Sequence, residues 1–174
     1  MISERPFQTA KDTDMRIKTE TAAEKYRDRL FAAAFHICRN AADADDVVQE
    51  TLLRYHKTDM EFASEEHLKA WLLRVAINQA KNVNRSFFRH RIVPLEDYME
   101  TLTFDSGDSE NLFLEVMRLP EKYRIVIHLY YYEEYSVRQI SQILGITDSN
   151  TKIRLARGRA MLKEKLQEEW DENE

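Results

Sequence analysis

The chain of 174 residues is poor in glycine, proline and cysteine, with three Gly, three Pro and one Cys. So few turn-forming residues leave little room for the many tight turns of a β-rich fold, whereas abundant Ala, Leu, Glu, Lys and Arg favour helices. A single cysteine, Cys38, excludes an internal disulfide and a multi-cysteine zinc site, so we expect it to be a small buried side chain. The composition predicts an all-α protein.

Long apolar runs are also absent. The first residues, MISERPFQTAKDTDMRIK, contain no apolar segment of a secretory signal. No stretch approaches the roughly 20 apolar residues that cross a bilayer. We therefore expect a cytoplasmic protein with no membrane insertion of this chain.

Patterns that carry catalysis are missing as well. The five histidines have no metal-ligand spacing with one another, and no glycine-rich phosphate loop, G-x-S-x-G turn or paired-acid arrangement is present. The sequence thus predicts no enzyme, no metal site and no cofactor.

The net charge of −5 is unevenly distributed. Residues 74–91 carry five Lys or Arg and no acid, and residues 138–165 carry seven Lys or Arg against two acids, a balance of 7 − 2 = +5. Between them, residues 94–110 hold six acids, no base, one Pro and one Gly, which is typical of a flexible acidic linker. We therefore predict two small helical domains, 17–91 and 111–170, joined by a linker at 92–110.

Helical periodicity in the first domain places an acidic face on the outside of its second helix. Thr21 and Glu24 fit a capping box that begins the first helix, and Ser64 can cap the third. In the second helix the apolar positions Ala44, Val48, Leu52 and Tyr55 share the inner face. This arrangement turns four residues outward: Asp46, Gln49, Glu50 and Leu53.

The strongest local pattern is SVRQISQILGITDSNTKIRLARGRAMLKEKL, which has the form of a helix-turn-helix. Gly145 tolerates the positive φ that the turn needs, and a second helix is predicted from about Asp148. On that helix Thr151, Leu155, Gly158 and Leu162 share an inward face. The other sides of this helix would contact base edges and phosphates in a major groove, or else form an ordinary solvated basic face.

Taken together, these motifs resemble the small extracytoplasmic-function (ECF) type of RNA polymerase sigma factor, which contains only the domains called region 2 and region 4. ADADDVVQETLLRY is similar to that family's core-binding signature A-x-D-x-V-Q-E-T. AWLLRVAINQAKNVNR is similar to its A-W-L-x-R-x-A-x-N stretch, and LPEKYR with the helix-turn-helix to its terminal region. The resemblance extends over roughly residues 21 to 168.

The resemblance implies partners for three surfaces. It implies that Asp46, Gln49, Glu50 and Leu53 dock on the clamp helices of the largest subunit of RNA polymerase core, although acids near the start of a helix, Asp43 above all, also stabilise their own helix. It implies that the downstream (−10) promoter element is opened and bound by Phe62, Asn78, Lys81, Asn82 and Arg85, with Asn78 and Phe62 lining a pocket for a flipped base. For the upstream (−35) element the implied residues are Ser149, Asn150, Lys152, Ile153, Arg154 and Arg157.

Several interpretations remain open from sequence. Trp71 fits a core position better than a stacking platform for a base, and Phe87 and Phe88 fit either. Thr151 and Gly158 depart from the family pattern at inward positions. A cognate anti-sigma factor is a further expected partner. Two other functions compete with promoter-directed initiation: a sigma mimic that sequesters an anti-sigma factor, and a helix-turn-helix regulator that binds operators alone.

Overall fold

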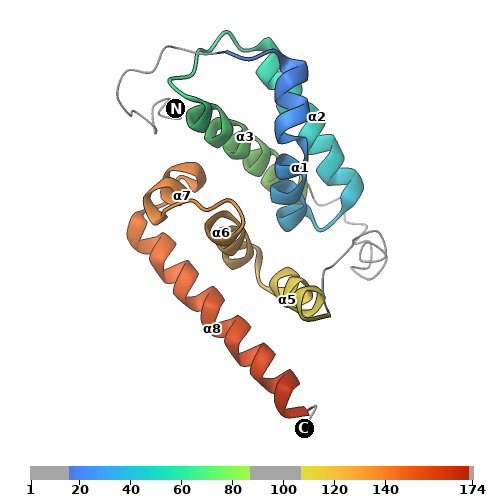
Figure 1. Cartoon of the computed structure of the whole chain (residues 1–174), viewed down its shortest axis with the longest axis vertical. Coiled ribbons are helices and arrows are strands. Elements are labelled where there is room, and N and C mark those ends of the chain that lie inside the picture. Colours follow the sequence, from blue (N-terminus) through green and yellow to red (C-terminus); the bar gives the residue numbers. More distant parts are fainter. Residues whose placement is uncertain (1–15, 87–106, 173–174) are drawn as a thin grey trace. The chain divides into compact units, whose positions relative to one another are not determined.

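The computed structural model describes residues 16–86 and 107–172, and every regular element in these two stretches is an α-helix. The all-α prediction is therefore confirmed. The helices form two compact units, the first with three helices and the second with α5, α6, α8 and the start of α7 (Figure 1). Their bounds are α1 Thr19–Cys38, α2 Ala41–Lys57, α3 Glu65–Arg85, α5 Gly107–Arg118, α6 Glu121–Tyr131, α7 Val137–Leu144 and α8 Asp148–Glu172.

The described stretches contain neither a membrane-spanning helix nor a cluster of metal-binding side chains. None of their helices combines the length and apolar character needed to cross a membrane. No group of three or more His, Cys, Asp or Glu side chains within them is placed to hold a metal ion.

Two of the three helices of the first unit start at a side-chain cap, whereas α1 does not. Ser64 caps α3 by accepting the His67 N–H at 3.1 Å, as predicted. Asn40 caps α2 by accepting the Asp43 N–H at 3.0 Å. The predicted capping box at Thr21 is wrong, because α1 begins two residues earlier at Thr19, after Lys18 with its backbone already extended.

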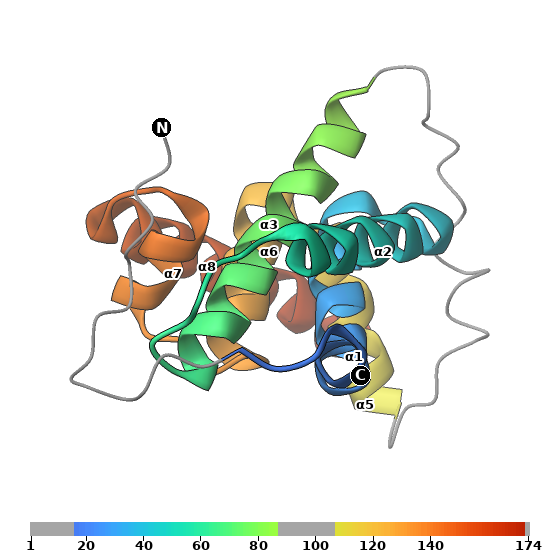
Figure 2. The same ribbon diagram turned by 90° about the horizontal axis from the view of Figure 1, so that it is seen from above.

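The first unit is a three-helix arrangement around one apolar core. Figures 1 and 2 show α1, α2 and α3 lying against one another. Tyr26, Leu30, Ala33 and Ile37 of α1 are all buried, as their spacing predicts. Cys38 is half-buried, and its thiol donates to the Ala80 carbonyl over 3.8 Å. The core of this unit therefore fixes which sides of α2 and α3 remain outside.

The chain before α1 fastens the end of α2. The Arg16 guanidinium donates to the Tyr55 carbonyl at 2.9 Å and the Met60 carbonyl at 3.2 Å, and it lies over the Tyr55 ring. In return the Tyr55 hydroxyl donates to the Ile17 carbonyl at 2.7 Å. Because the last carbonyls of a helix lack partners within it, these bonds secure the carboxyl end of α2.

In the second unit, a buried arginine joins α5 to α6. Arg124 is 4% exposed and donates from Nη1 to the carbonyls of Met117 and Leu119, at 2.9 and 2.8 Å. This explains the Arg in the LPEKYR motif, since it satisfies the carbonyls at the end of α5. The helix α5 already begins at Gly107, so the last residues of the predicted linker are helical, and the rest of that linker lies outside the described residues.

The helix-turn-helix is present as predicted. Ser136 and Gln139 form a reciprocal capping box at the start of α7, with bonds of 2.9 and 3.3 Å between backbone N–H groups and side-chain oxygens. Gly145 adopts φ 66°, in the left-handed region, and the Ile146 N–H donates to the Ser141 carbonyl at 3.0 Å across the turn. Helix α8 then starts at Asp148, the predicted residue.

The two departures at inward positions of α8 have physical explanations. Thr151 is fully buried, but its hydroxyl donates to the Thr147 carbonyl at 3.1 Å, so no polar group is left unsatisfied there. Gly158 lies where α8 passes close to α6: a Cβ at this position would meet the Ile127 side chain at 3.2 Å. Glycine therefore permits this close approach at the cost of some helix propensity.

Candidate functional site

The outer side of α2 carries an exposed polar surface, here called the α2 face and made of Asp46, Gln49, Glu50 and Leu53. All four residues are exposed, and Leu53 retains 50% of its accessible surface. On the opposite side Ala44, Val48 and Tyr55 are buried, which accounts for the outward direction of the face. The predicted exposure of this face is confirmed.

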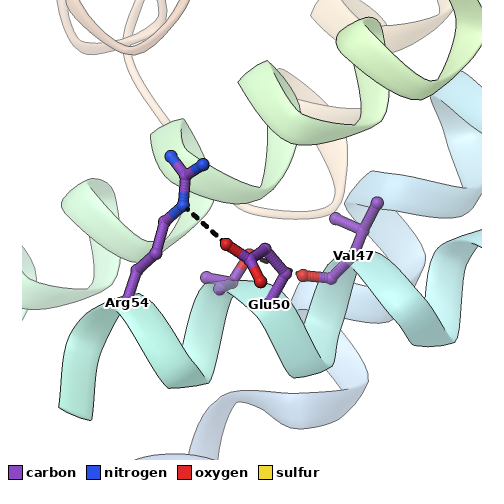
Figure 3. Close-up of polar contacts among 4 residues, drawn as sticks. Val47, Glu50 and Arg54 are labelled. Atoms are coloured by element: carbon purple, nitrogen blue, oxygen red, sulfur yellow. Dashed lines mark hydrogen bonds and ion pairs between the residues drawn. The ribbon is translucent and has the colours of Figure 1, made fainter. Parts of the chain in front are cut away.

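Within the α2 face, Glu50 has an internal partner. Its Oε1 accepts a hydrogen bond and ion pair from Arg54 Nε at 3.1 Å, one helical turn further on (Figure 3). Both side chains are about half exposed, and exposed pairs at this spacing contribute only about 0.3–0.5 kcal/mol. Glu50 can therefore exchange Arg54 for a cation of a partner at little cost.

Sequence reasoning missed Arg54. The sequence does predict this pair, because a Glu four residues before an Arg on a helix commonly forms a stabilising ion pair. The pair matters for any test of this face, since a change at Glu50 also alters α2 itself.

The acids at the start of α2 have roles within the unit. Asp43 lies in the first turn, where a carboxylate favours the positive end of the helix dipole. Asp45 forms an ion pair with Arg27 of α1 at 3.5 Å. These two acids therefore differ from Asp46 and Glu50, which lie further along the exposed side.

The carboxyl-terminal half of α3 presents a second surface. Asn78, Asn82 and Arg85 are exposed, and Lys81 is half-buried. The last three residues follow Asn78 by three, four and seven positions, so all four share one side of the helix. Asn84 points elsewhere: its amide donates to the Ile37 carbonyl at 2.7 Å. The structure thus brings four of the five predicted −10 residues to one face.

Phe62 does not belong to that surface, and its predicted contact with DNA is corrected. The side chain is 0% exposed, and its ring lies against His67, Trp71 and Tyr55, with centroids 5.3, 5.6 and 6.0 Å away. Burial of a phenylalanine ring is strongly favourable, and a ring with no accessible surface cannot line a pocket for a base. Trp71 lies in the same cluster but is only half-buried, so part of its side chain stays accessible.

The cluster around Phe62 also contains a buried histidine. His67 is 9% exposed, and its Nδ1 accepts the Ala63 N–H at 3.1 Å. Burial lowers the pKa of His67, which keeps the imidazole neutral at physiological pH. The cluster therefore supports the turn before α3.

A third surface is the outer side of α8. Ser149, Lys152, Ile153 and Arg157 are exposed, whereas Asn150 and Arg154 are half-buried. Arg154 donates from Nε to the Asn150 Oδ1 at 3.1 Å, so each of these two side chains holds the other in place. The buried residues Thr151 and Leu155 lie on the opposite side.

Aromatic residues of α6 contact two cations of α8, Arg157 and Arg159. A hydrogen bond from Arg157 lowers the pKa of Tyr123, with the Lys122 charge contributing. Arg159 donates from Nε to the Tyr131 hydroxyl at 2.6 Å, and its guanidinium lies over the rings of Tyr130 and Tyr131 at 5.1 and 5.5 Å. Arg159 was not among the predicted DNA-binding residues. Its position depends on aromatic rings of another helix, and spacing along α8 alone cannot predict such a contact.

Comparison with known proteins agrees with this arrangement. The family model for Sigma-70 region 2 matches residues 22–89, and that for Sigma-70, region 4 matches residues 110–162. The chain is 32% identical over 147 residues to the ECF RNA polymerase sigma factor SigL of Mycobacterium tuberculosis, which covers 80% of this chain and 83% of SigL. It is 25% identical over 165 residues to the ECF RNA polymerase sigma factor SigW of Bacillus subtilis, covering 82% of this chain and 86% of SigW.

A solved structure shares the fold. The sigma factor RpoE in complex with the anti-sigma factor NepR, from Bartonella quintana, matches with a TM-score of 0.66 and 24% identity, covering 85% of this chain and 96% of that chain. Two region models in chain order and a relative at 32% identity over most of both sequences establish the family. The chain belongs to the ECF RNA polymerase sigma factors of the sigma-70 family.

Proposed function

We propose that the chain is an alternative sigma factor, which binds RNA polymerase core and directs it to promoters to initiate transcription. One observation carries the proposal: both sigma-70 regions occur in order on one chain that exposes an acidic α2 face and a basic α8. In this proposal residues 17–91 form region 2, residues 111–170 form region 4, and residues 92–110 join them.

The α2 face is the proposed docking surface for the clamp helices of the largest polymerase subunit. Asp46 and Glu50 supply carboxylates for charge-assisted hydrogen bonds to a basic partner, and Gln49 supplies an amide. Leu53, half exposed beside them, supplies apolar contact. Complementary charge of this kind sets the rate and specificity of association.

The surface on α3 is the proposed contact for the −10 element. Asn78 would hydrogen-bond a base that has left the stack, while Lys81, Asn82 and Arg85 hold the phosphates of the opened strand. Phe62 is buried and is left out of this proposed contact.

The outer side of α8 is the proposed contact for the −35 element. Lys152 and Arg157 are exposed cations beside Ser149 and Ile153, as a helix in the major groove requires. Arg154, fixed by Asn150, presents an oriented guanidinium at the edge of the same surface. Phosphate contacts from these cations would set the register, and the residues between them would read base edges.

The net charge of −5 makes the proposed DNA binding depend on polymerase. An acidic protein gains little from long-range attraction to DNA, so core enzyme must bring it to the promoter. The proposal therefore implies a cytoplasmic location, because that is where polymerase acts. A cognate anti-sigma factor, the kind of partner that RpoE has in the related complex, is the second proposed protein partner.

A pair of binding measurements separates this proposal from its two rivals. Purified chain is mixed with polymerase core, and promoter DNA is added with and without core. A sigma factor binds core and binds promoter DNA only with core. A sigma mimic fails to bring core to DNA, and an independent helix-turn-helix regulator binds DNA without core; either result would overturn the proposal.

A further inference from the structure

An exposed isoleucine lies at the centre of the outer side of α8. Ile153 retains 51% of its accessible surface, although the helix around it is rich in cations. Ser149, Ala156 and Ala160 are exposed as well, and with Ile153 they follow the spacing of four, three and four residues that forms one ridge along a helix. No member of this ridge carries a charge.

The ridge is bordered by cations on both sides. At 100° per residue, one edge of the exposed surface is formed by Lys152, Arg159 and Lys163, and the other by Arg154 and Arg157. The buried residues Leu155 and Gly158 lie opposite the ridge. An uncharged strip between two cationic edges therefore faces outward.

This distribution of charge matches the cross-section of a DNA major groove. Phosphates line both walls of the groove, and the base edges form its floor. When the cationic edges of α8 meet the two walls, the ridge meets the floor. Single exposed apolar residues are common on protein surfaces, but Ile153 is distinguished by its place between the two edges.

The chemistry of the Ile153 side chain limits which groups of a base it can recognise. It has no hydrogen-bonding group, so the donor and acceptor pattern of the bases is outside its reach. The apolar group that the major-groove floor offers is the 5-methyl group of thymine. We propose that Ile153 contacts the 5-methyl group of a thymine in the −35 element and thereby specifies that position; this inference rests on the proposed sigma function.

Replacement of thymine by deoxyuridine tests the contact, because it removes only the methyl group. Holoenzyme assembled from core and the full chain first selects duplexes from a library randomised over the −35 region. Each thymine of a selected duplex, on either strand, is then replaced singly by deoxyuridine, and Kd is measured. We expect binding to weaken roughly fourfold at one position or two adjacent positions, the value of one buried methyl group.

Variants of the chain assign that effect to Ile153. With Ile153→Ala the loss on deoxyuridine substitution should vanish at the same position, and with Ile153→Val it should persist. Leu112→Ala, at a residue 40% exposed on α5, is the matched control and should behave as the natural chain. Equal sensitivity of the natural chain and Ile153→Ala at every thymine would overturn the inference, as would selected elements without thymine on either strand.

Failure of this inference differs from failure of the proposed function. If holoenzyme binding depends on the −35 sequence and weakens with Lys152→Ala and Arg157→Ala, while deoxyuridine has no effect specific to Ile153, only the thymine contact is wrong. If neither the −35 sequence nor these cations affect promoter binding, the proposed role of α8 is wrong as well.

Discussion

Reversal of one charge on the α2 face distinguishes docking on polymerase from support of the helix itself. In Glu50→Lys the side chain loses its pair with Arg54, 3.1 Å away, and a like charge takes its place. An exposed pair at this spacing is worth about 0.3–0.5 kcal/mol, and like charges cost a similar amount, so the unfolding free energy should fall by about 1 kcal/mol at most.

Binding to core should change much more. A carboxylate that meets a basic surface is replaced by an ammonium group, and like charges brought together at an interface cost several kcal/mol. A loss of about 3 kcal/mol is roughly a hundredfold in Kd. The salt dependence of binding should also weaken, because an attractive exposed pair is lost.

Two further variants separate the contributions. Arg54→Glu breaks the same pair and also creates a like-charge pair, yet it leaves the acid at position 50. Glu50→Lys combined with Arg54→Glu restores an intrahelical pair but leaves a cation at position 50. We expect core binding to be lost in Glu50→Lys and in the double variant, and retained in Arg54→Glu.

The assay combines thermal melting of the free chain with fluorescence anisotropy against core at two salt concentrations. If affinity follows melting temperature across the three variants, or if the double variant binds as the natural chain does, then Glu50 acts on its own helix and the docking assignment is refuted.

Three other outcomes are expected. Lys152→Ala with Arg157→Ala should weaken use of a −35-dependent promoter by at least tenfold in run-off transcription with no loss of affinity for core, since phosphate or base contacts are worth about 1–3 kcal/mol each; unchanged transcription would count against α8. Gly145→Ala should lower the unfolding free energy by about 1 kcal/mol because φ is 66°, and Gly145→Asn should cost less in the same chemical denaturation; equal effects would contradict a backbone cause. Burial lowers the pKa of His128 from 6.5 to about 4, so the unfolded chain takes up a proton first as pH falls, and the unfolding free energy should drop by roughly 3 kcal/mol from pH 6.5 to pH 4. His128→Phe should lack that part of the pH dependence in denaturation curves, and an identical slope would show that another group is responsible.

Helical periodicity predicted the faces of the helices well. The inward positions Tyr26 and Leu30, and the outward positions Asp46 and Glu50, lie where their spacing places them. This works because each helix has a single neighbouring core, so burial depends on the angle around the helix axis alone. The turn at Gly145 was equally predictable, since few residues other than glycine adopt the positive φ of this position.

Features that depend on contacts between elements were not predictable. Phe62 lies in the connection between α2 and α3, where helical spacing does not predict the direction of a side chain, and its burial against the rings of Tyr55 and Trp71 is seen only in the structure. The position of Arg159 depends on Tyr131 of α6, and the need for Gly158 depends on Ile127 of the same helix. The start of α1 was misplaced because Thr21 and Glu24 fit a cap that the helix does not use.

Promoter-specific initiation by a reconstituted enzyme tests the central claim most directly. Core polymerase is supplied with duplexes selected by the holoenzyme, and transcripts are mapped to their 5′ ends with and without the chain. We predict that the chain produces transcripts from one start site downstream of the selected −35 and −10 elements, and that core alone produces none there. Binding of the chain to core without any such start site would contradict a sigma function.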